Sequence, residues 1–543
     1  MRQIHRLFSW LSIGVMGICV LAACPANRLA AAGDSFDCLL QAERNAWQAQ
    51  KAFTECLQFT RGWLAHRDPR SGLIPRNLTR DNHWNAKDSA ADNYPFMVLT
   101  AALLDRELFY STMIEMLESE IRLTNRLDNL PDDFDFAEQR FLHEKIDLNR
   151  LIFGSSEYVK DGLIPLTEWM GMSPWAGRMI GIQNSIWKHA PFETDYGNIP
   201  SDDFEINGEQ LQVLCRLYWM TGDDRCRQWA FRIADYYLLD HLPTDGERLS
   251  LDDHGCEIIG GLAGAYYLAS KTDPDRRAKY REPIHRMLDR ILEVGANDDG
   301  LFHMVINPQT ADVLRDELTD NWGYDYNAVL NVAQLDDESC YYEAVRHVLE
   351  NIHKYVYYPW EGGGSDGYAD SIEGGLNLLN RIPIDSGFQW VDDSMDILLA
   401  KQRPDGVIEG WHGDGNFART ALMYALWKTQ GVHIQPWRAD VAFGAVFDGG
   451  NLYITLRSDW NWSGVIKFDP PRHKVYLNLP SDYPRINQFP EWFTVDVDQI
   501  YAITLNGVDQ DPQKGGDLLK GLQVQSKAGV PLHATVTLLD SKQ

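Results

Sequence analysis

A short turn motif recurs along the chain and limits the folds available to it more than any other feature. It appears as SGLIP at 71–75, DGLIP at 161–165, DGLFH at 299–303 and DGVIE at 405–409. A single Asp-Gly dipeptide carries no weight, because this dipeptide is common in turns. Four similar stretches in similar surroundings indicate a repeated architecture.

Each motif marks a change in helix type. The segment before it has an amphipathic helical pattern, and the segment after it begins polar and becomes apolar nearly all round, as at 244–270. A helix that is apolar on all sides must be buried. With the weaker members DGERL and DGYAD we count six crossings, near residues 72, 162, 246, 300, 367 and 406. The pattern predicts a mainly α fold, an (α/α)6 toroid over residues 36–436 with the buried helices as its inner ring.

The pattern changes at about Trp437. From 441 to 468 apolar and polar residues alternate, interrupted by Gly and Asn, and LHATVTLLD at 532–540 has the same character. Such alternation is typical of strands. We therefore expect a C-terminal β-sandwich over residues 437–543. The aromatic and Pro-rich stretch YPRINQFPEWF at 483–493 is expected to pack on the toroid.

The N-terminus has the features of an export signal. Arg2, His5 and Arg6 precede an apolar run that ends in LAAC at Cys24. This segment, 1–24, resembles a bacterial lipoprotein signal, which predicts lipidation of Cys24 and attachment to a membrane through that lipid. A secretory signal cleaved near LAAAG at 29–33 and a retained anchor are also compatible with the segment. All three place the protein outside the cytoplasm, in the periplasm or on the outer membrane if it is a lipoprotein and otherwise secreted.

The net charge of −28 argues against a nucleic-acid partner, which needs a basic surface. Of eight cysteines, six follow the signal, and none forms a C-x-x-C pair, so a zinc or redox site is not indicated. Cys215 and Cys226 flank one turn and can either pair or stay as buried free thiols. No EF-hand pattern supports a Ca²⁺ site, and no organic cofactor is indicated.

Acids, aromatic residues and histidines gather where the predicted inner helices begin. A lone Asp there can simply cap the helix. Capping does not require Trp and His in the same loops, however, whereas an acidic, aromatic cleft suits a carbohydrate. The substrate-binding candidates are His83, Trp84, Asn93, Tyr94, His254, Trp322, Tyr324, Trp411 and His412.

Together, the repeated turns, the polar-to-apolar inner helices and the C-terminal β region resemble the six-hairpin glycosidase superfamily, over roughly residues 36–540. The resemblance is architectural, and no catalytic residue is carried over from it. It implies a carbohydrate-active enzyme. The superfamily includes hydrolases of neutral sugars and of unsaturated uronides, and similar toroids with β-sandwiches occur in polysaccharide lyases. The fold therefore leaves the reaction open.

Glycoside hydrolysis needs two carboxyl groups, one as general acid and one as base or nucleophile. The catalytic candidates are Asp88, Asp92, Asp253, Glu257, Asp325 and Glu373. Asp88/Asp92 and Asp253/Glu257 are each spaced four apart, so each pair shares one helix face. The leading hypothesis is an exported glycoside hydrolase that acts on a poly- or oligosaccharide through such a pair.

A polysaccharide lyase is the second hypothesis. It would need a Tyr or His base and a group that neutralises a uronate, and Tyr324, His254, Asn327 and Arg419 are of the right types. The candidate loops contain few Arg and Lys beside many acids, which argues against it. Arg472, His473 and Arg485 lie on the β region and can equally be domain contacts. A non-catalytic surface glycan-binding lipoprotein and a sugar epimerase with paired histidines also stay open.

Overall fold

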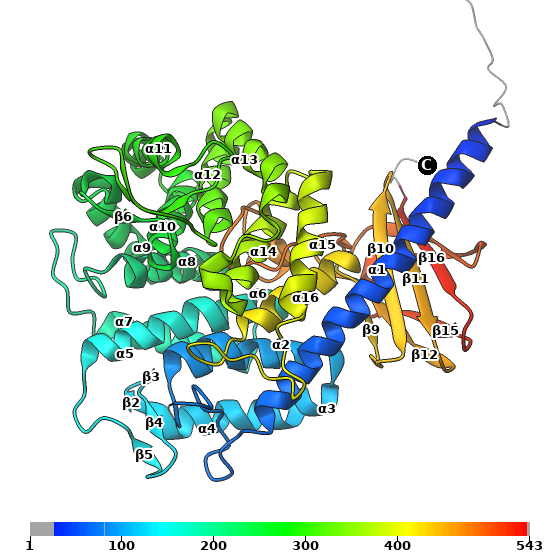
Figure 1. Ribbon diagram of the computed structural model, residues 1–543, viewed down its shortest axis with the longest axis horizontal. Helices are drawn as coiled ribbons and strands as arrows, with labels where there is room; N and C mark the ends of the chain where they lie inside the picture. The colour runs from blue at the N-terminus through cyan, green and yellow to red at the C-terminus, as the bar shows by residue number, and fades with distance from the viewer. Residues whose placement is uncertain (1–25, 81, 540–543) are drawn as a thin grey trace, which may run out of the picture.

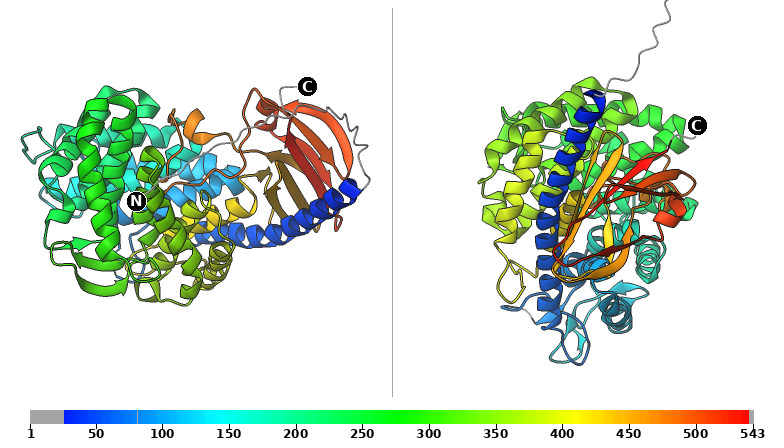
Figure 2. Two further views of the ribbon diagram at one scale, coloured as in Figure 1. Left: turned by 90° about the horizontal axis from the view of Figure 1, so that it is seen from above. Right: turned by 90° about the vertical axis from the view of Figure 1, so that its right-hand side faces the viewer.

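The computed structural model describes residues 26–80 and 82–539, without the side chains of residues 26–34, 253 and 254. It shows a helical body next to a smaller β region, and the long helix α1 (Ala26–Leu64) runs from one to the other (Figures 1 and 2). The predicted signal peptide and Cys24 lie outside the described residues. Among those residues, no helix combines the length and apolar character that crossing a bilayer requires.

Half-exposed and buried helices alternate around the helical body, as the sequence predicts. The half-exposed helices form the outer layer: α1, α3 (Arg106–Leu108) with η2 (Phe109–Met113) and α4 (Ile114–Thr124), α7 (Pro174–Lys188), α9 (Asp224–Asp235) with η4 (Tyr236–Asp240), α11 (Pro274–Gly295), α13 (Ser339–Asn351) and α15 (Asp385–Leu399). The buried ones are η1 (Ala86–Asn93) with α2 (Tyr94–Leu104), α5 (Leu148–Glu157) with η3 (Tyr158–Leu163) and α6 (Ile164–Met170), α8 (Phe204–Thr221), α10 (Asp253–Thr272), α12 (Trp322–Asp336), α14 (Ser365–Leu379) and α16 (Asn416–Lys428).

The buried helices contact one another in chain order, and the ring closes where α16 meets α2. The described residues thus contain seven inner members, one more than the predicted crossings. The predicted crossing near residue 162 is wrong, because DGLIP lies within continuous helix, at the end of the π-helical segment η3 and the start of α6. The chain instead crosses from outer to inner helices at 125–147 and 189–203, where no Asp-Gly turn marks the passage.

Close packing of small residues explains the Gly-rich inner helices. A Cβ on Gly261 of α10 would lie 2.7 Å from the Gly208 carbonyl oxygen of α8. Likewise, a Cβ on Gly162 of η3 would lie 2.8 Å from the Ala91 carbonyl oxygen of η1. Both distances are too short for non-bonded carbon and oxygen, so glycine is what lets these inner segments approach. By contrast, Gly300 and Gly406 have φ of +89° and +87° and form true turns.

Short hairpins and helical turns decorate the loops of the helical body. These are β1 (His83–Trp84), β4 (Phe134–Asp135) and β5 (Arg140–Phe141) in one sheet, β2 (Asn125–Leu127) with β3 (Leu130–Pro131), and β6 (Leu249–Ser250) with β7 (His303–Asn307) and β8 (Asp312–Leu318). The turns are η5 (Pro243–Asp245), η6 (Ile352–Tyr355) and η7 (Trp360–Gly363).

The strands predicted after residue 437 are confirmed, and they form two antiparallel sheets. One has the order β10-β11-β16-β13-β14, with β10 (Val441–Asp448), β11 (Asn451–Ser458), β16 (Leu532–Leu538), β13 (Ile500–Leu505) and β14 (Val508–Lys514). The other has the order β15-β12-β9, with β15 (Leu522–Ser526), β12 (Trp462–Lys467) and β9 (His433–Gln435). Helix α1 packs on β10, where a Cβ on Gly444 would lie 2.7 Å from Ala46 Cα. The β-sandwich itself stays a prediction.

The connection from β12 to β13, residues 468–499, returns to the helical body and includes the short helix α17 (Arg472–Val475); α18 (Gly515–Leu518) follows β14. Arg485 in this connection contacts Glu168 of α6, with Nη2 2.9 Å from Oε2. Arg216 of α8 contacts the same carboxylate at 2.9 Å. We call Glu168, Arg216 and Arg485 the arginine cluster. The predicted packing of 483–493 on the toroid is therefore confirmed.

The described cysteines are all free. Cys215 and Cys226 are buried on α8 and α9 and form no disulfide. They are the buried free thiols that the sequence also allowed, and burial raises the pKa of both to about 12.

Candidate active site

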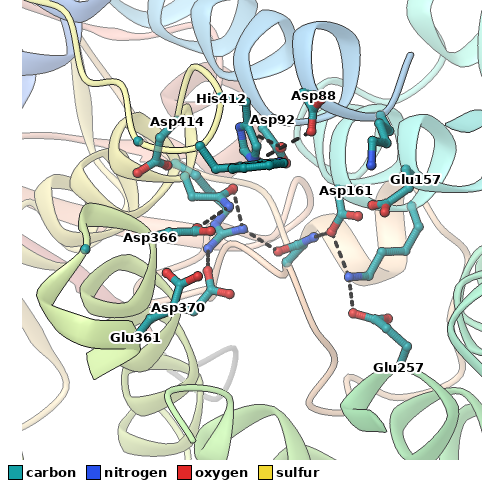
Figure 3. A pocket seen from close by; sticks show the side chains of 18 of the residues that line it. Asp88, Asp92, Glu157, Asp161, Glu257, Glu361, Asp366, Asp370, His412 and Asp414 are labelled. Carbon is teal, nitrogen blue, oxygen red and sulfur yellow. Dashed lines mark hydrogen bonds and ion pairs between the residues drawn. The ribbon is translucent and has the colours of Figure 1, made fainter. Parts of the chain in front are cut away.

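A cavity of about 520 Å³ lies where the inner helices begin. Figure 3 shows side chains from several inner segments converging on it. Its lining is strongly acidic, with eleven carboxyl groups: Asp88, Asp92, Glu157, Asp161, Glu205, Glu209, Glu257, Glu361, Asp366, Asp370 and Asp414. The basic side chains that line it are Lys87, Lys160, His412 and Arg419. Such an excess of buried acids is costly unless ligands, protons or partners offset it.

Asp88 and Asp92 project from η1 toward His412. The side chain of Asn85 caps η1 by accepting from the backbone N–H groups of Asp88 and Ser89. His412 Nε2 lies 3.7 Å from Asp88 Oδ1, and Nδ1 lies 3.6 Å from Asp92 Oδ2. One imidazole therefore stands between two carboxyl groups (Figure 3).

The pKa values of Asp88 and Asp92 are shifted in opposite directions. Burial raises the pKa of Asp92 well above its usual range, although His412 acts against this. Burial also opposes ionisation of Asp88, but His412 and the bonds from Asn85 and Arg76 outweigh it, so the pKa of Asp88 is lowered. Burial disfavours the charged form of His412, yet Asp92 and Asp88 raise its pKa to about 9. At neutral pH, Asp88 is ionised and His412 is cationic, while burial favours the protonated form of Asp92.

A second group of charges forms the opposite side of the cavity, and we call Glu157, Lys160, Asp161, Glu209 and Glu257 the acidic wall. Lys160 Nζ donates to Asp161 Oδ1 at 2.7 Å and also to Glu257. Asn487, from the connection between the sheets, donates from Nδ2 to Asp161 Oδ1 at 2.8 Å. Carboxylate oxygens of Glu157, Asp161 and Glu209 all lie within 4.8 Å of one another.

The acidic wall also separates protonated from ionised groups. Burial raises the pKa of Glu157 and of Glu209 well above the usual range, and the neighbouring carboxylates add to the effect. Burial acts in the same direction on Asp161, but Lys160 and the hydrogen bonds it receives outweigh that and lower its pKa. Asp161 is thus the group of the three whose charged form is favoured, whereas burial and like charges disfavour charge on Glu157 and Glu209.

Arg419 organises the third side of the cavity. It contacts Asp370, and its Nε lies 2.6 Å from Glu373 Oε2. Its Nη2 donates to Tyr324 Oη at 3.2 Å, and Tyr324 donates in turn to Glu373 at 2.8 Å. Burial raises the pKa of Asp370 to about 6 despite Arg419. Its Nη1 donates to the amide oxygens of Asn416 and Asn487, so this guanidinium is held by carboxyl, phenol and amide groups of the protein.

The structure brings some of the predicted site residues to the cavity and not others. The residues that line it are Asp88, Asp92, Glu257, Tyr324, Trp411 and His412. Glu373 is fully buried behind Arg419, and Asp325 is buried at 1% exposure, with neither oxygen bonded within the described part of the chain. Burial raises the pKa of both carboxyl groups. The side chains of Asp253 and His254 lie outside the described residues.

Five predicted substrate contacts do not line the cavity. Trp84, Asn93, Tyr94 and Trp322 are buried, and His83 is half-buried in β1. Tyr94 donates to the Met113 carbonyl oxygen and accepts from Trp175 Nε1, which is a core contact. Trp322 donates to Ser371 Oγ at 2.8 Å. Of the predicted tryptophans, only Trp411 is exposed, at 66%, with the guanidinium groups of Arg76 and Arg80 over its ring.

Sequence reasoning missed most of the acidic wall. The signal was present, because Glu157/Asp161, Glu205/Glu209 and Asp366/Asp370 repeat the four-residue spacing of Asp88/Asp92 on other inner segments. Asp161 and Asp366 each precede a glycine, and in the sequence this makes them resemble turn residues. No local pattern indicates Asn487, which lies 326 positions from its partner Asp161.

No family model and no curated protein matches the chain. Among solved structures, it is similar to an α-1,6-mannanase of a Salegentibacter species, with a TM-score of 0.39 and 12% identity over 69% of this chain and 98% of that chain. It is also similar to a cellobiose 2-epimerase from Bacillus thermoamylovorans, with a TM-score of 0.38 and 12% identity over 57% and 96%. A possible GH105 family member from Salmonella enterica has a TM-score of 0.40 and 11% identity over 57% and 90%.

The predicted toroid architecture rests on this chain's own ring of alternating outer and inner helices. At these TM-scores the likeness to the three structures carries no further argument. The chemistry of the cavity has to be derived from its own residues.

Proposed function

We propose that this protein is an exported glycoside hydrolase that cleaves a poly- or oligosaccharide with two carboxyl groups at the mouth of the toroid. The observation that carries the proposal is that carboxyl groups on different inner segments line one cavity, some with a raised pKa and some with a lowered pKa. Hydrolysis of a glycosidic bond needs one of each, on opposite sides of that bond. Environments that drive two acids apart in pKa assign the roles of acid and base.

The spacing of the acids favours a pair from two different segments. In known glycosidases the two carboxyl groups are about 5–9.5 Å apart. Glu157 and Asp161 are closer than this, since their oxygens lie within 4.8 Å, so no sugar bond fits between them. Asp88 is engaged by Arg76 and Asn85. We choose Asp92 on η1 and Asp161 on η3 because they lie on different segments and their pKa values are shifted in opposite directions.

In this pair, Asp92 is the general acid and Asp161 is the base or nucleophile. Burial raises the pKa of Asp92 and favours its protonated form, so it can protonate the leaving oxygen. Asp161 is ionised because Lys160 and Asn487 stabilise its charge. Trp411, exposed at the mouth, offers an aromatic face on which a sugar ring can stack.

The cavity is poorly suited to lyase chemistry. A lyase must neutralise a uronate carboxylate, but Lys160, His412 and Arg419 already contact carboxyl groups of the protein. Lys87 lies over the Phe153 ring and is outnumbered by the acids around it. The cationic His412 cannot act as a base, and the buried Tyr324 phenol has a strongly raised pKa.

The test is a panel of neutral and uronate-containing glycans, with reducing ends and the ultraviolet absorbance of unsaturated uronates followed together. Reducing ends without absorbance are expected. Asp92→Asn and Asp161→Asn should each lower kcat by about 10²- to 10⁴-fold. Glu350→Gln, an exposed acid on α13, is the matched control and should keep full activity.

Several outcomes would contradict the proposal. Rising absorbance would mean a lyase, and tight binding without any cleavage would mean a glycan-binding protein. Full activity in both Asp variants would show that the carboxyl pair is wrong.

Export is the second part of the proposal, and it is supported by the signal-like segment before Cys24. Expression of the full chain in a bacterium, followed by mass analysis of the membrane fraction, should find a lipidated N-terminal cysteine. A Cys24→Ala chain should lose this attachment. Recovery of the wild-type chain from the cytoplasm with an intact N-terminus would contradict export.

A further inference from the structure

The acidic wall contains a buried carboxylate that no described group satisfies. Glu209 is 1% exposed and lines the cavity, and its Oε2 forms no hydrogen bond within the described part of the chain. The cation of the wall, Lys160, is already shared by Asp161 and Glu257. One ammonium group thus serves four carboxyl groups, and among the described side chains its close ion pairs are with Asp161 and Glu257 rather than with Glu157 or Glu209.

Lys160 shows what kind of cation this wall accommodates. Its ammonium nitrogen binds between two carboxylates, with 2.7 Å to Asp161 Oδ1. A second ammonium group beside Glu157 and Glu209 would repeat that geometry on the adjoining oxygens. A divalent metal ion at the same place would bind Asp161 and so lie within a few ångströms of the Lys160 charge, which opposes it. A monovalent nitrogen cation on an organic ligand therefore fits the wall better than a metal ion does.

Other features of the cavity also favour an organic ligand with polar groups. Asp414, on a different segment, is 4% exposed and lines the cavity, and its Oδ1 has no hydrogen-bond partner within the described residues. A volume of about 520 Å³ is within the range of pockets for organic molecules. A ligand with hydroxyl groups and an ammonium group would satisfy both kinds of orphaned oxygen.

We propose that Glu157, Asp161 and Glu209 bind the free amino group of a hexosamine unit, so that the substrate is a glycan with unacetylated amino sugars. This inference rests on the proposed hydrolase function for its link to cleavage. The binding part stands without it, because ammonium recognition needs only the acidic wall. An N-acetyl group would remove the positive charge and leave Glu209 unpaired.

The experiment compares two ligands of nearly equal size. Methyl glucosaminide has an ammonium group where methyl glucoside has a hydroxyl group, so calorimetric titration of the purified protein isolates the effect of charge. Both anomers and the galacto forms are included. We expect the amino sugar to bind more than about tenfold more tightly, as close charge pairs do. The preference should fall to about threefold or less in Glu209→Gln, while Glu350→Gln should retain it.

Four outcomes separate the possibilities. Equal Kd values for the amino and hydroxyl sugars in the wild-type protein would overturn the inference, whether or not the variant folds. Glu209-dependent binding of Ca²⁺ that competes with the amino sugar would also overturn it, in favour of a metal site. Cleavage of neutral glycans with no preference for amino sugars would overturn it while leaving the proposed function standing. Tight amino-sugar binding without cleavage of any glycan would support the acidic wall and contradict the hydrolase.

Discussion

Glu168 of the arginine cluster and Asp161 of the acidic wall lie close together in the chain, yet the charges around them are matched very differently. Glu168 of α6 is bound by Arg216 and by Arg485, and all three side chains are buried. Seven residues earlier, the acidic wall has a single ammonium group for four carboxyl groups. Burial opposes ionisation at both places. The two arginines outweigh it and lower the pKa of Glu168, whereas burial and like charges raise the pKa of Glu209.

The difference separates a structural role from a functional one. A buried carboxylate with complete partners stabilises the contact between the helical body and the returning connection. A buried carboxylate without partners is maintained at a cost in stability, which is typical of sites that bind or transform a ligand. The same residue type thus has two roles, and the partners of each residue decide between them.

The largest expected effect is the loss of the matched carboxylate. Glu168→Gln leaves Arg216 and Arg485 buried with their shared anion gone, so the free energy of unfolding should fall by about 3–5 kcal/mol. Because the pKa of Glu168 is lowered, its stabilisation is present above the unfolded pKa near 4.5 and is lost as the pH falls. Urea denaturation at several pH values measures the loss of unfolding free energy and its dependence on pH. The exposed control Glu350→Gln should lose no more than about 0.5 kcal/mol of unfolding free energy. An equally small loss in Glu168→Gln would contradict the structural role of Glu168.

The same substitution in the acidic wall should have the opposite sign. Glu209→Gln removes a carboxyl group that faces Glu157, Asp161, Glu205 and Glu257, with Lys160 as the cation among its main neighbours. We expect the unfolding free energy to rise by about 1–2 kcal/mol at neutral pH. The pKa of Glu209 is higher in the folded protein than in the unfolded chain, so Glu209 destabilises the wild-type fold only above pH 4.5, and more strongly as the pH rises. The stability gained by Glu209→Gln should therefore be absent below pH 4.5 and increase with pH. If Glu209→Gln lowered the unfolding free energy at neutral pH, the view that the acidic wall has too few cations for its carboxyl groups would be contradicted.

Asn487 tests the link between the two regions, because it lies two residues after Arg485 and contacts the acidic wall. Its φ is +60°, so Asn487→Gly keeps the backbone and its N–H bond to Glu373 while removing the amide that stabilises Asp161. If Asp161 is the base, kcat should fall about tenfold, the worth of one hydrogen bond to a charged group. The acidic limb of the kcat profile should move to higher pH. Asn478→Gly, also at positive φ, is the control. An unchanged profile would exclude Asn487 as a positioning residue.

The smallest effect is expected at the mouth, outside both clusters. Trp411→Ala removes an exposed ring that stacks with arginines, so KM should rise about three- to fivefold with little change in kcat. Steady-state kinetics on the best glycan of the panel measures this. A large fall in kcat instead would indicate that Trp411 positions the reacting bond.

The sequence predicted a ring of alternating helices, but it did not predict the number of inner members or most of the residues that line the cavity. The alternation of amphipathic and all-apolar helices is a local signal, and Asp88 and Asp92 followed from their spacing. SGLIP and DGLIP differ by one residue, yet Gly72 lies in a turn with φ of +77° and Gly162 is helical because it packs on η1. Tertiary packing decides between these outcomes. Likewise, Trp322 and Trp411 both lie in polar stretches, and only the packed structure separates the core ring from the exposed one.

The returning connection also limits how the chain can be divided. Arg485 and Asn487 come from the region that holds the sheets, but they bind the arginine cluster and the acidic wall. A chain that ended at residue 436 would contain every carboxyl group that lines the cavity and would still lack the Asn487 amide, which together with Lys160 lowers the pKa of Asp161. The C-terminal region is therefore no interchangeable accessory module. Replacement of that region would have to preserve Arg485 and Asn487 to keep their contacts with the helical ring.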